Sequence, residues 1–278
     1  MTEAEVNEIR MLLRNHPLWN RSRLSRELCM RWNWQRPDGQ IKDMACRELL
    51  RKLEFRTLIK LPPRQCPSPG RLPIIESVKV DRSPVSCLLS DIKHVKIVNV
   101  GKCVKYGKAF NYLVKEYHYL SYGRPVGQNM KYMILGRNER FLGCLLFGVA
   151  VWKVEVRDRW IGWSADVRER NLGLICNNTR FLILDWVKVP HLASHALGAC
   201  VRRLPRDWKL RYGTDIAMAE TFVDTTRYIG TYYKAANWLK IGRTKRRSRQ
   251  DRNNKLKVSV KDILVYPLRR DFRKLLLA

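Results

Sequence analysis

The chain has 278 residues, of which 45% are hydrophobic, which is enough for one large domain and a small one and excludes a disordered polybasic tail. Its 55 Lys and Arg residues against 25 Asp and Glu residues leave a net charge of +30. Such an excess binds polyanions by releasing their counterions, so we expect a nucleic-acid partner. A basic protein without such a partner is the alternative. An anionic membrane surface is disfavoured, because no hydrophobic anchor accompanies the charge.

The eight cysteines are scattered singly, without any Cys-x-x-Cys pair, which argues against a zinc ribbon and against a disulfide framework. Single thiols within apolar runs are typical of a reducing compartment. The N-terminus does not resemble a signal peptide, and the longest apolar run, residues 142–152, is too short to span a bilayer. We therefore expect a cytoplasmic protein without a membrane partner.

Residues 1–62 predict a winged helix-turn-helix that binds DNA. Thr2 and Glu5 have the spacing of a capping box, and three helical patterns follow, before residues 55–61 alternate loosely like a short wing. The third helix offers four cations for phosphate contacts: Lys42, Arg47, Arg51 and Lys52. A three-helix packing module with solvated charges is the alternative, since residues 1–62 hold thirteen basic against eight acidic residues.

Residues 63–86 are rich in proline and show little periodicity, which predicts a semi-rigid linker. A separate mixed α/β domain is expected over residues 87–278. Its expected outer elements are strands at 95–100, 131–135, 142–154 and 262–266 and helices at 104–117 and 164–172.

A strand–helix–strand unit is expected at the centre of this domain. Residues 181–189 are almost continuously apolar, as in a strand covered on both faces, and Asn177 and Asn178 before them fit a turn. Apolar residues then recur at helical spacing over residues 192–204, and a second strand is expected at 216–223. Polar side chains collect where these strands stop, which is where ligands of α/β folds usually bind.

Four residues near this edge are candidates for catalysis: His118, His195, Glu220 and Asp224. Glu220 and Asp224 lie four apart, which places both on one face of a regular strand. With Asp185 they could hold Mg²⁺ or Mn²⁺ and activate water for phosphodiester cleavage. A histidine at these positions could act as a general base or metal ligand. Ion pairing of the carboxylates with arginines, and packing or capping by the histidines, are the structural alternatives.

The most basic stretch of the chain is the loop 243–257. We expect it to be solvated when free and to contact phosphates without reading bases. Its predicted contacts are Arg243, Lys245, Arg246, Arg247, Arg249 and Arg252.

Six motifs lie in order within residues 117–268. They are YHYL at 117–120, WIGW at 160–163, NNTRFLIL at 177–184, LASH at 192–195, ETFVD at 220–224 and AANW at 235–238. In these motifs the chain resembles the DruA family of the Druantia anti-phage defence systems, whose domain also occurs beside transposase domains. The resemblance covers more than half of the chain and implies a role in defence or mobile DNA.

The order of the expected elements is also similar to that of GNAT acyltransferases. In that fold a fourth strand leads into a helix whose start holds the pyrophosphate of acetyl-CoA, and residues 187–198 occupy that place here. The chain departs from the pattern, because no glycine lies between Pro190 and Leu197. Backbone N–H groups need a glycine-rich turn to approach a pyrophosphate. The resemblance therefore implies the fold more strongly than the cofactor.

These observations predict a DNA-binding protein of a prokaryotic defence or mobile-element system, with a winged helix-turn-helix and a GNAT-like α/β domain. It would bind double- or single-stranded DNA and cleave or process it with a divalent metal. Two alternatives stay open: an acyltransferase that uses a CoA donor, and a non-catalytic adaptor that recruits a partner helicase or transposase.

Overall fold

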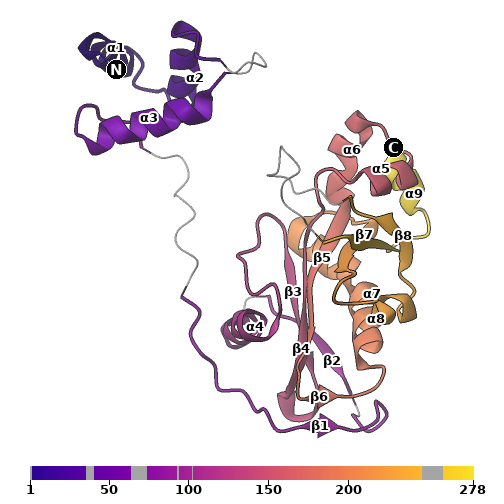
Figure 1. The fold of residues 1–278 in the computed structure, drawn as a ribbon. Coiled ribbons are helices and arrows are strands. Elements are labelled where there is room, and N and C mark those ends of the chain that lie inside the picture. The colour runs from indigo at the N-terminus through magenta and orange to yellow at the C-terminus, as the bar shows by residue number, and fades with distance from the viewer. Residues whose placement is uncertain (1, 36–40, 64–73, 93, 102, 246–258) are drawn as a thin grey trace. The chain divides into compact units, whose positions relative to one another are not determined.

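A computed structural model describes the chain except for residues 1, 36–40, 64–73, 93, 102 and 246–258. The chain divides into two compact units, Met1–Pro73 and Ile74–Ala278 (Figure 1). The boundary, between Pro73 and Ile74, lies inside the predicted linker of residues 63–86. In the described parts of the chain, no helix is long and apolar enough to cross a membrane.

The first unit contains three helices, α1 (Glu3–Asn15), α2 (Arg21–Arg31) and α3 (Asp43–Phe55), whose apolar faces share one core. The predicted capping box is confirmed. The Glu5 carboxylate accepts the Thr2 N–H at 2.6 Å, and the Thr2 hydroxyl accepts the Glu5 N–H at 3.4 Å. Two of the backbone donors that a helix start leaves unpaired are thereby satisfied.

The predicted wing over residues 55–61 does not form. Phe55 still belongs to α3, and residues 56–63 contain no strand. Ile59 and Leu61 are instead buried in the core of the three helices. A wing needs paired strands that extend from the module, whereas this segment covers the core with its apolar side chains. In its described residues the first unit is therefore a module of three helices whose core is covered by the segment 56–63.

The second unit is built on a seven-stranded sheet in the order β2-β3-β4-β5-β7-β9-β8, with a separate β1–β6 pair (Figure 1). The strands are β1 (Val85–Ser86), β2 (Lys96–Asn99), β3 (Met130–Leu135), β4 (Phe141–Val149), β5 (Ile175–Ile183), β6 (Val187–Lys188), β7 (Met218–Asp224), β8 (Leu239–Arg243) and β9 (Lys261–Pro267). In the main sheet β5 and β7 are parallel and the other pairs antiparallel. The mixed α/β class predicted from the sequence is confirmed.

Helices lie on both faces of this sheet. They are α4 (Val104–Tyr117), α5 (Glu155–Ile161), α6 (Ala165–Asn171), α7 (Leu192–Tyr212), α8 (Thr231–Ala235) and α9 (Phe272–Leu277), with 3₁₀ turns at Arg137–Glu139 and Leu172–Leu174. On β3, Lys131 donates to Asn111 of α4 at 2.8 Å, and the next residue, Tyr132, donates to Asp207 of α7 at 3.0 Å. Because successive strand residues point to opposite faces, α4 and α7 cover opposite sides (Figure 1).

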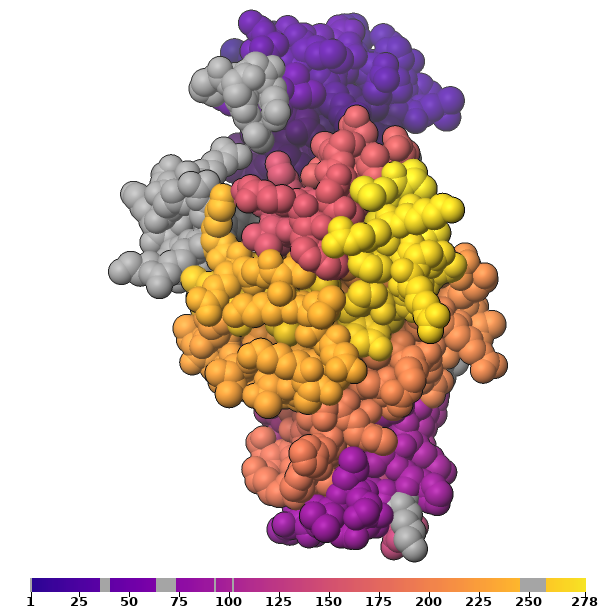
Figure 2. All heavy atoms as spheres, turned by 90° about the vertical axis from the view of Figure 1, so that its right-hand side faces the viewer, coloured from indigo at the N-terminus to yellow at the C-terminus, as the bar shows by residue number. Residues whose placement is uncertain are grey.

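The C-terminal helix closes one end of the second unit. Figure 2 shows α9 against the region of α5 and α6. The Asn171 amide at the end of α6 donates to the carbonyls of Leu276 and Ala278, at 3.2 and 2.8 Å. A separate hydrophobic cluster joins these helices to the sheet through residues such as Trp163 and Met218. The end of the sheet nearest α5 is thus a packed core.

The parallel strands β5 and β7 pair along only part of their length. Residues 175–178 pair with residues 218–221, and the last residues of the two strands do not pair with each other. Thr179 is an extra residue of β5 opposite β4, because the register shifts there. A bulge of this kind bends its strand. The two strands therefore part toward their carboxyl ends.

Several predicted boundaries differ from the structure. The strand predicted at 181–189 begins at Ile175 and ends at Ile183, so the polar pair Asn177 and Asn178 lies inside it. Both residues lie in the ladders to β4 and β7, and this pairing overrides the preference of Asn for turns. Asp185 consequently falls in a turn. The strand predicted at 142–154 ends at Val149.

Candidate functional site

A cavity of about 1030 Å³ lies where β5 and β7 part. Its walls come from the second half of β5, the end of β7, the residues that end α4, the loop before α5, the region of α8, and β8 with β9. The backbones of β5 and β7 no longer share hydrogen bonds here, so side chains line the space between them. Ligand binding was expected at the edge where these strands stop, and the cavity occupies that edge.

Aromatic rings form much of the cavity wall. Tyr119 follows α4 and Tyr228 follows β7, and their ring centroids are 5.5 Å apart. Phe181 of β5 meets Tyr232 of α8 edge to face, with centroids 5.0 Å apart. His118 stacks on Tyr119 with centroids 4.8 Å apart. Rings from three separate segments therefore converge on one space.

Three cations at the cavity, Lys153, Arg180 and Lys261, make no salt bridge among the described residues. Lys153 lies near the carboxylate of Glu155 and Lys261 near that of Asp224, whose pKa values they help to lower. Arg180 instead donates to two carbonyls, that of Ser121 at 3.0 Å and that of Thr179 at 2.8 Å. Burial lowers the pKa of the Arg180 guanidinium, but an arginine stays charged at neutral pH. The cavity therefore holds one guanidinium, that of Arg180, with which no described carboxylate pairs.

Two of the predicted loop contacts, Arg243 and Lys245, also line the cavity. Both are paired, Arg243 with Asp262 at 2.9 Å and Lys245 with Glu155 at 2.6 Å. The other predicted contacts of this loop lie outside the described residues: Arg246, Arg247, Arg249 and Arg252.

His118 ends α4 and lines the cavity with a side chain that is buried. Its Nδ1 accepts the Leu120 N–H at 3.2 Å. Burial, together with the nearby charge of Arg180, lowers the pKa of His118 to about 4. Since Nδ1 accepts, the proton of the neutral ring is on Nε2, which can only donate. His118 at neutral pH is thus a hydrogen-bond donor and a weak base.

Asp224 ends β7 and also lines the cavity. Its Oδ1 accepts the N–H and hydroxyl of Thr226 at 3.0 and 2.7 Å, and its Oδ2 accepts the Ser259 hydroxyl at 2.7 Å. The Thr226 hydroxyl is the main reason that the pKa of Asp224 is lowered. The carboxylate therefore holds the loop after β7 to the start of β9. Asp185 lines the cavity from the turn after β5 and is exposed.

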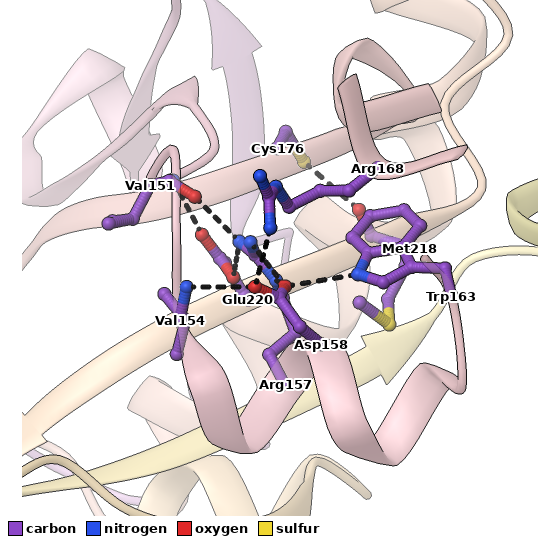
Figure 3. Close-up of polar contacts among 9 residues, drawn as sticks. All are labelled: Val151, Val154, Arg157, Asp158, Trp163, Arg168, Cys176, Met218 and Glu220. Carbon is purple, nitrogen blue, oxygen red and sulfur yellow. Dashed lines mark hydrogen bonds and ion pairs between the residues drawn. The ribbon is translucent and has the colours of Figure 1, made fainter. Parts of the chain in front are cut away.

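Glu220 is engaged in a buried ion pair (Figure 3). Arg157 donates to its Oε2 at 2.9 Å, the Val151 N–H donates to its Oε1 at 2.8 Å, and both charged side chains are 0% exposed. Arg157 also donates to Asp158, which accepts the Trp163 indole N–H. Burial raises the pKa of Glu220, and the Arg157 charge opposes that rise. Glu220 is thus held in a buried ion pair and does not line the cavity.

The predicted metal site of Asp185, Glu220 and Asp224 is not assembled. No group of three or more His, Cys, Asp or Glu residues among those the structure describes could hold a metal ion. The reason is the strand geometry. Residues four apart on a regular strand share a face but lie about 13 Å from each other, whereas ligands of one Mg²⁺ each lie about 2 Å from it.

His195 lies on an exposed part of α7 and is not in the cavity lining. The residue of the first turn of α7 that does line the cavity is Ala193. The four predicted catalytic residues thus separate: His118 and Asp224 both line the cavity, Glu220 is buried in an ion pair, and His195 is exposed.

In the first unit, the predicted DNA contacts of α3 are partly neutralised. Arg47 pairs with Asp43, and Arg51 pairs with Glu48 at 3.3 Å. Lys52 is exposed, and Lys42 stands directly before the helix. Helix α3 therefore presents a weaker positive face than its sequence predicts.

Asn177 and Arg180 are among the cavity residues that were not assigned to a site from the sequence. Asn177 is 7% exposed, and its Oδ1 has no hydrogen-bond partner in the described structure. The amide of its neighbour Asn178, by contrast, donates to the carbonyls of Leu146 and Arg180 and accepts the Tyr233 hydroxyl. The signal in the sequence is the polar pair before an apolar strand, which fits a turn equally well.

The family model described as Druantia protein DruA matches residues 83–257, which include every described strand except β9. The chain belongs to this family. No match was found among the curated proteins. The family membership places the protein among components of a defence system, as the motifs within residues 117–268 had indicated.

Solved structures that are similar to this chain share little of its sequence. The spermidine/spermine N-acetyltransferase SpeG from Vibrio cholerae is 6% identical, with 63% of this chain and 92% of that one covered at a TM-score of 0.36. The CoA-dependent acyl-homoserine lactone synthase MesI is 12% identical, with 66% of this chain and 93% of that one covered at a TM-score of 0.35. The N-terminal domain of a ribosomal-protein-alanine acetyltransferase from Clostridium acetobutylicum is 10% identical, with 52% of this chain and 93% of that one covered at a TM-score of 0.28.

Proposed function

We propose that this member of the DruA family binds DNA in anti-phage defence, with the cavity between β5 and β7 as a phosphate-binding centre. The observation that carries the proposal is Arg180, a cavity guanidinium that pairs with no described carboxylate, together with Lys153 and Lys261, which line the same cavity and make no salt bridge in the described chain. A guanidinium bonded only to carbonyls keeps its charge available for an anion, and a phosphodiester strand supplies one anion per nucleotide. The net charge of +30 adds a long-range attraction of the same sign.

The contacts of the β7 carboxylates support binding without metal-dependent cleavage. Glu220, one of the predicted metal ligands, is held by Arg157 and Val151. Asp224 has both carboxylate oxygens occupied by hydroxyl and N–H donors. These contacts leave the carboxylates of β7 as parts of the scaffold.

The test replaces Lys153, Arg180 and Lys261 by Gln and measures binding to an oligonucleotide at several salt concentrations. Losing three phosphate contacts should lower the slope of log affinity against log salt by about 2–3. The control replaces three exposed cations away from the cavity lining: Lys188, Arg202 and Arg206. An equal loss of DNA affinity in both triple variants would show that the positive charge acts over the whole surface and not at the cavity. No DNA binding by the wild type would overturn the proposal.

Acyl transfer with a CoA donor is a second candidate, favoured by one observation. The parallel strands β5 and β7 part around a cavity, and the start of α7 reaches its lining through Ala193. Against it, the Ser194 hydroxyl is bonded to the His191 carbonyl at 3.1 Å, and no glycine lies between Pro190 and Leu197. Acetyl-CoA at millimolar concentration should therefore leave the melting temperature unchanged. A rise of several degrees would favour acyl transfer.

An adaptor that recruits a helicase or transposase is compatible with DNA binding. The discriminating variants are His118→Gln and Asp224→Asn, because these are the two predicted catalytic residues that line the cavity. If phage defence in cells survives both replacements, the adaptor role is favoured. If DNA binding persists and defence is lost, the cavity takes part in a reaction.

A further inference from the structure

Phosphate binding alone does not account for the chemistry of the cavity. Tyr119 and Tyr228 are 39% and 42% exposed, although large aromatic rings are mostly buried in folded proteins. They come from segments after α4 and after β7 and lie against each other at the cavity, with ring planes inclined at 57°. Exposed rings beside cations are the combination that holds single-stranded nucleic acid, since each base offers a flat face for stacking.

Asn177 supplies a second, independent observation. It lies in the cavity lining, is more than nine-tenths buried, and has a carbonyl oxygen without a partner in the described structure. A buried polar atom that lacks a hydrogen bond costs about 1–3 kcal/mol. An amide offers donors and an acceptor side by side, as does the Watson–Crick edge of a base. A ligand with such an edge would satisfy Asn177.

The third element is Arg180, which lies three residues after Asn177 on the same strand. Its guanidinium bonds to two carbonyls and to no carboxylate of the described chain, so it keeps capacity for a phosphate oxygen. Exposed rings, an amide oxygen without a hydrogen bond and a guanidinium without a carboxylate match the base and the phosphate of one nucleotide. A volume of about 1030 Å³ accommodates a ligand of that size.

We propose that the cavity binds a single unpaired nucleotide of DNA, with its base against Tyr119 and Tyr228, its hydrogen-bonding edge toward Asn177 and its phosphate toward Arg180. A base inside a duplex is stacked on both faces and cannot enter a cavity, so the nucleotide must come from a single strand, a bulge or an extruded position. This inference rests on the proposed DNA binding and adds the structure of DNA that is preferred.

The experiment compares three duplexes of about 15 base pairs with the full-length protein: fully paired, with one bulged nucleotide, and with a bulged abasic site. The last two duplexes carry the same phosphates and the same distortion, so the difference between their affinities reports the contribution of the base alone. We expect the intact bulge to bind about tenfold to a hundredfold more tightly than the abasic bulge. Equal affinities would overturn the nucleotide site while DNA binding stands. No binding to any duplex would overturn the proposed function as well.

Two variants locate the effect. Tyr119→Ala with Tyr228→Ala should abolish the preference for the intact bulge and keep the binding of paired DNA. Asn177→Leu should also abolish it without loss of stability, because the leucine removes an unsatisfied polar group at similar volume. Trp152→Ala is the control, since Trp152 is 50% exposed and lies outside the cavity lining. A preference that persists in both cavity variants would overturn the proposal.

Discussion

Two arginines of the second unit are bonded in opposite ways. Arg157 is fully buried and donates to the carboxylates of Asp158 and Glu220. Arg180 lines the cavity and donates only to carbonyls, those of Ser121 and Thr179, among the described residues. Breaking a buried charge pair leaves an uncompensated charge, so Arg157 belongs to the scaffold. The Arg180 guanidinium lies beside a cavity without a carboxylate partner among the described residues, so it can bind an anionic ligand. The two arginines thus differ in role, one in stability and the other in binding.

The largest effect on stability is expected when the buried pair of Arg157 and Glu220 is broken. Glu220→Ala should destabilise the protein by about 3–5 kcal/mol, because it leaves Arg157 buried without its carboxylate. Urea denaturation measures the change. Glu169→Ala, at an exposed site, should stay within about 0.5 kcal/mol. The double replacement Arg157→Met with Glu220→Leu should recover much of the loss. If Glu220→Ala keeps full stability and abolishes defence, Glu220 acts in the reaction after all.

Arg180→Gln should have the opposite profile. The affinity for DNA should fall about tenfold to a hundredfold, the range of one hydrogen bond to a charged group, with the stability nearly unchanged. Fluorescence anisotropy with a labelled oligonucleotide measures the affinity, and Arg202→Gln on the exposed side of α7 is the matched control. A stability loss as large as that of Glu220→Ala would contradict the contrast between the two arginines.

A smaller effect is expected from pH at His118. Burial lowers the pKa of this histidine from 6.5 to about 4, so between these values the unfolded chain binds a proton that the folded chain does not. Stability is therefore complete above pH 6.5 and falls as the pH drops toward 4, by about 1–2 kcal/mol once partial solvation is allowed for. His118→Gln should flatten this decline in denaturation measured at several pH values, and His195→Gln should leave it as in the wild type.

The smallest effect is expected at His195. This residue is exposed on α7, outside the cavity lining, so His195→Ala should change the stability by less than about 0.5 kcal/mol. DNA affinity should change by less than about threefold. Loss of binding or of phage defence in this variant would restore His195 to the site and show that the functional surface extends beyond the cavity.

Local patterns predicted the elements whose side chains alternate or recur clearly. The helix expected at 104–117 is α4 with the same bounds, and the capping box at Thr2 and Glu5 is present. Patterns failed where tertiary pairing overrode propensity. Asn177 and Asn178 favour a turn in isolation, but two neighbouring strands pair with them and keep them extended. The wing failed similarly, since burial of Ile59 and Leu61 decided the path of that segment.

The sequence alone determined the sign and size of the charge, the mixed α/β class and the family, because each is carried by residue type and local order. Which charges are free was decided only by the tertiary structure. Pairing depends on distances between residues far apart in the chain, such as the 2.9 Å that joins Arg157 to Glu220. The same long-range contacts part β5 from β7 and leave Asn177 and Arg180 at a cavity that no local pattern specifies.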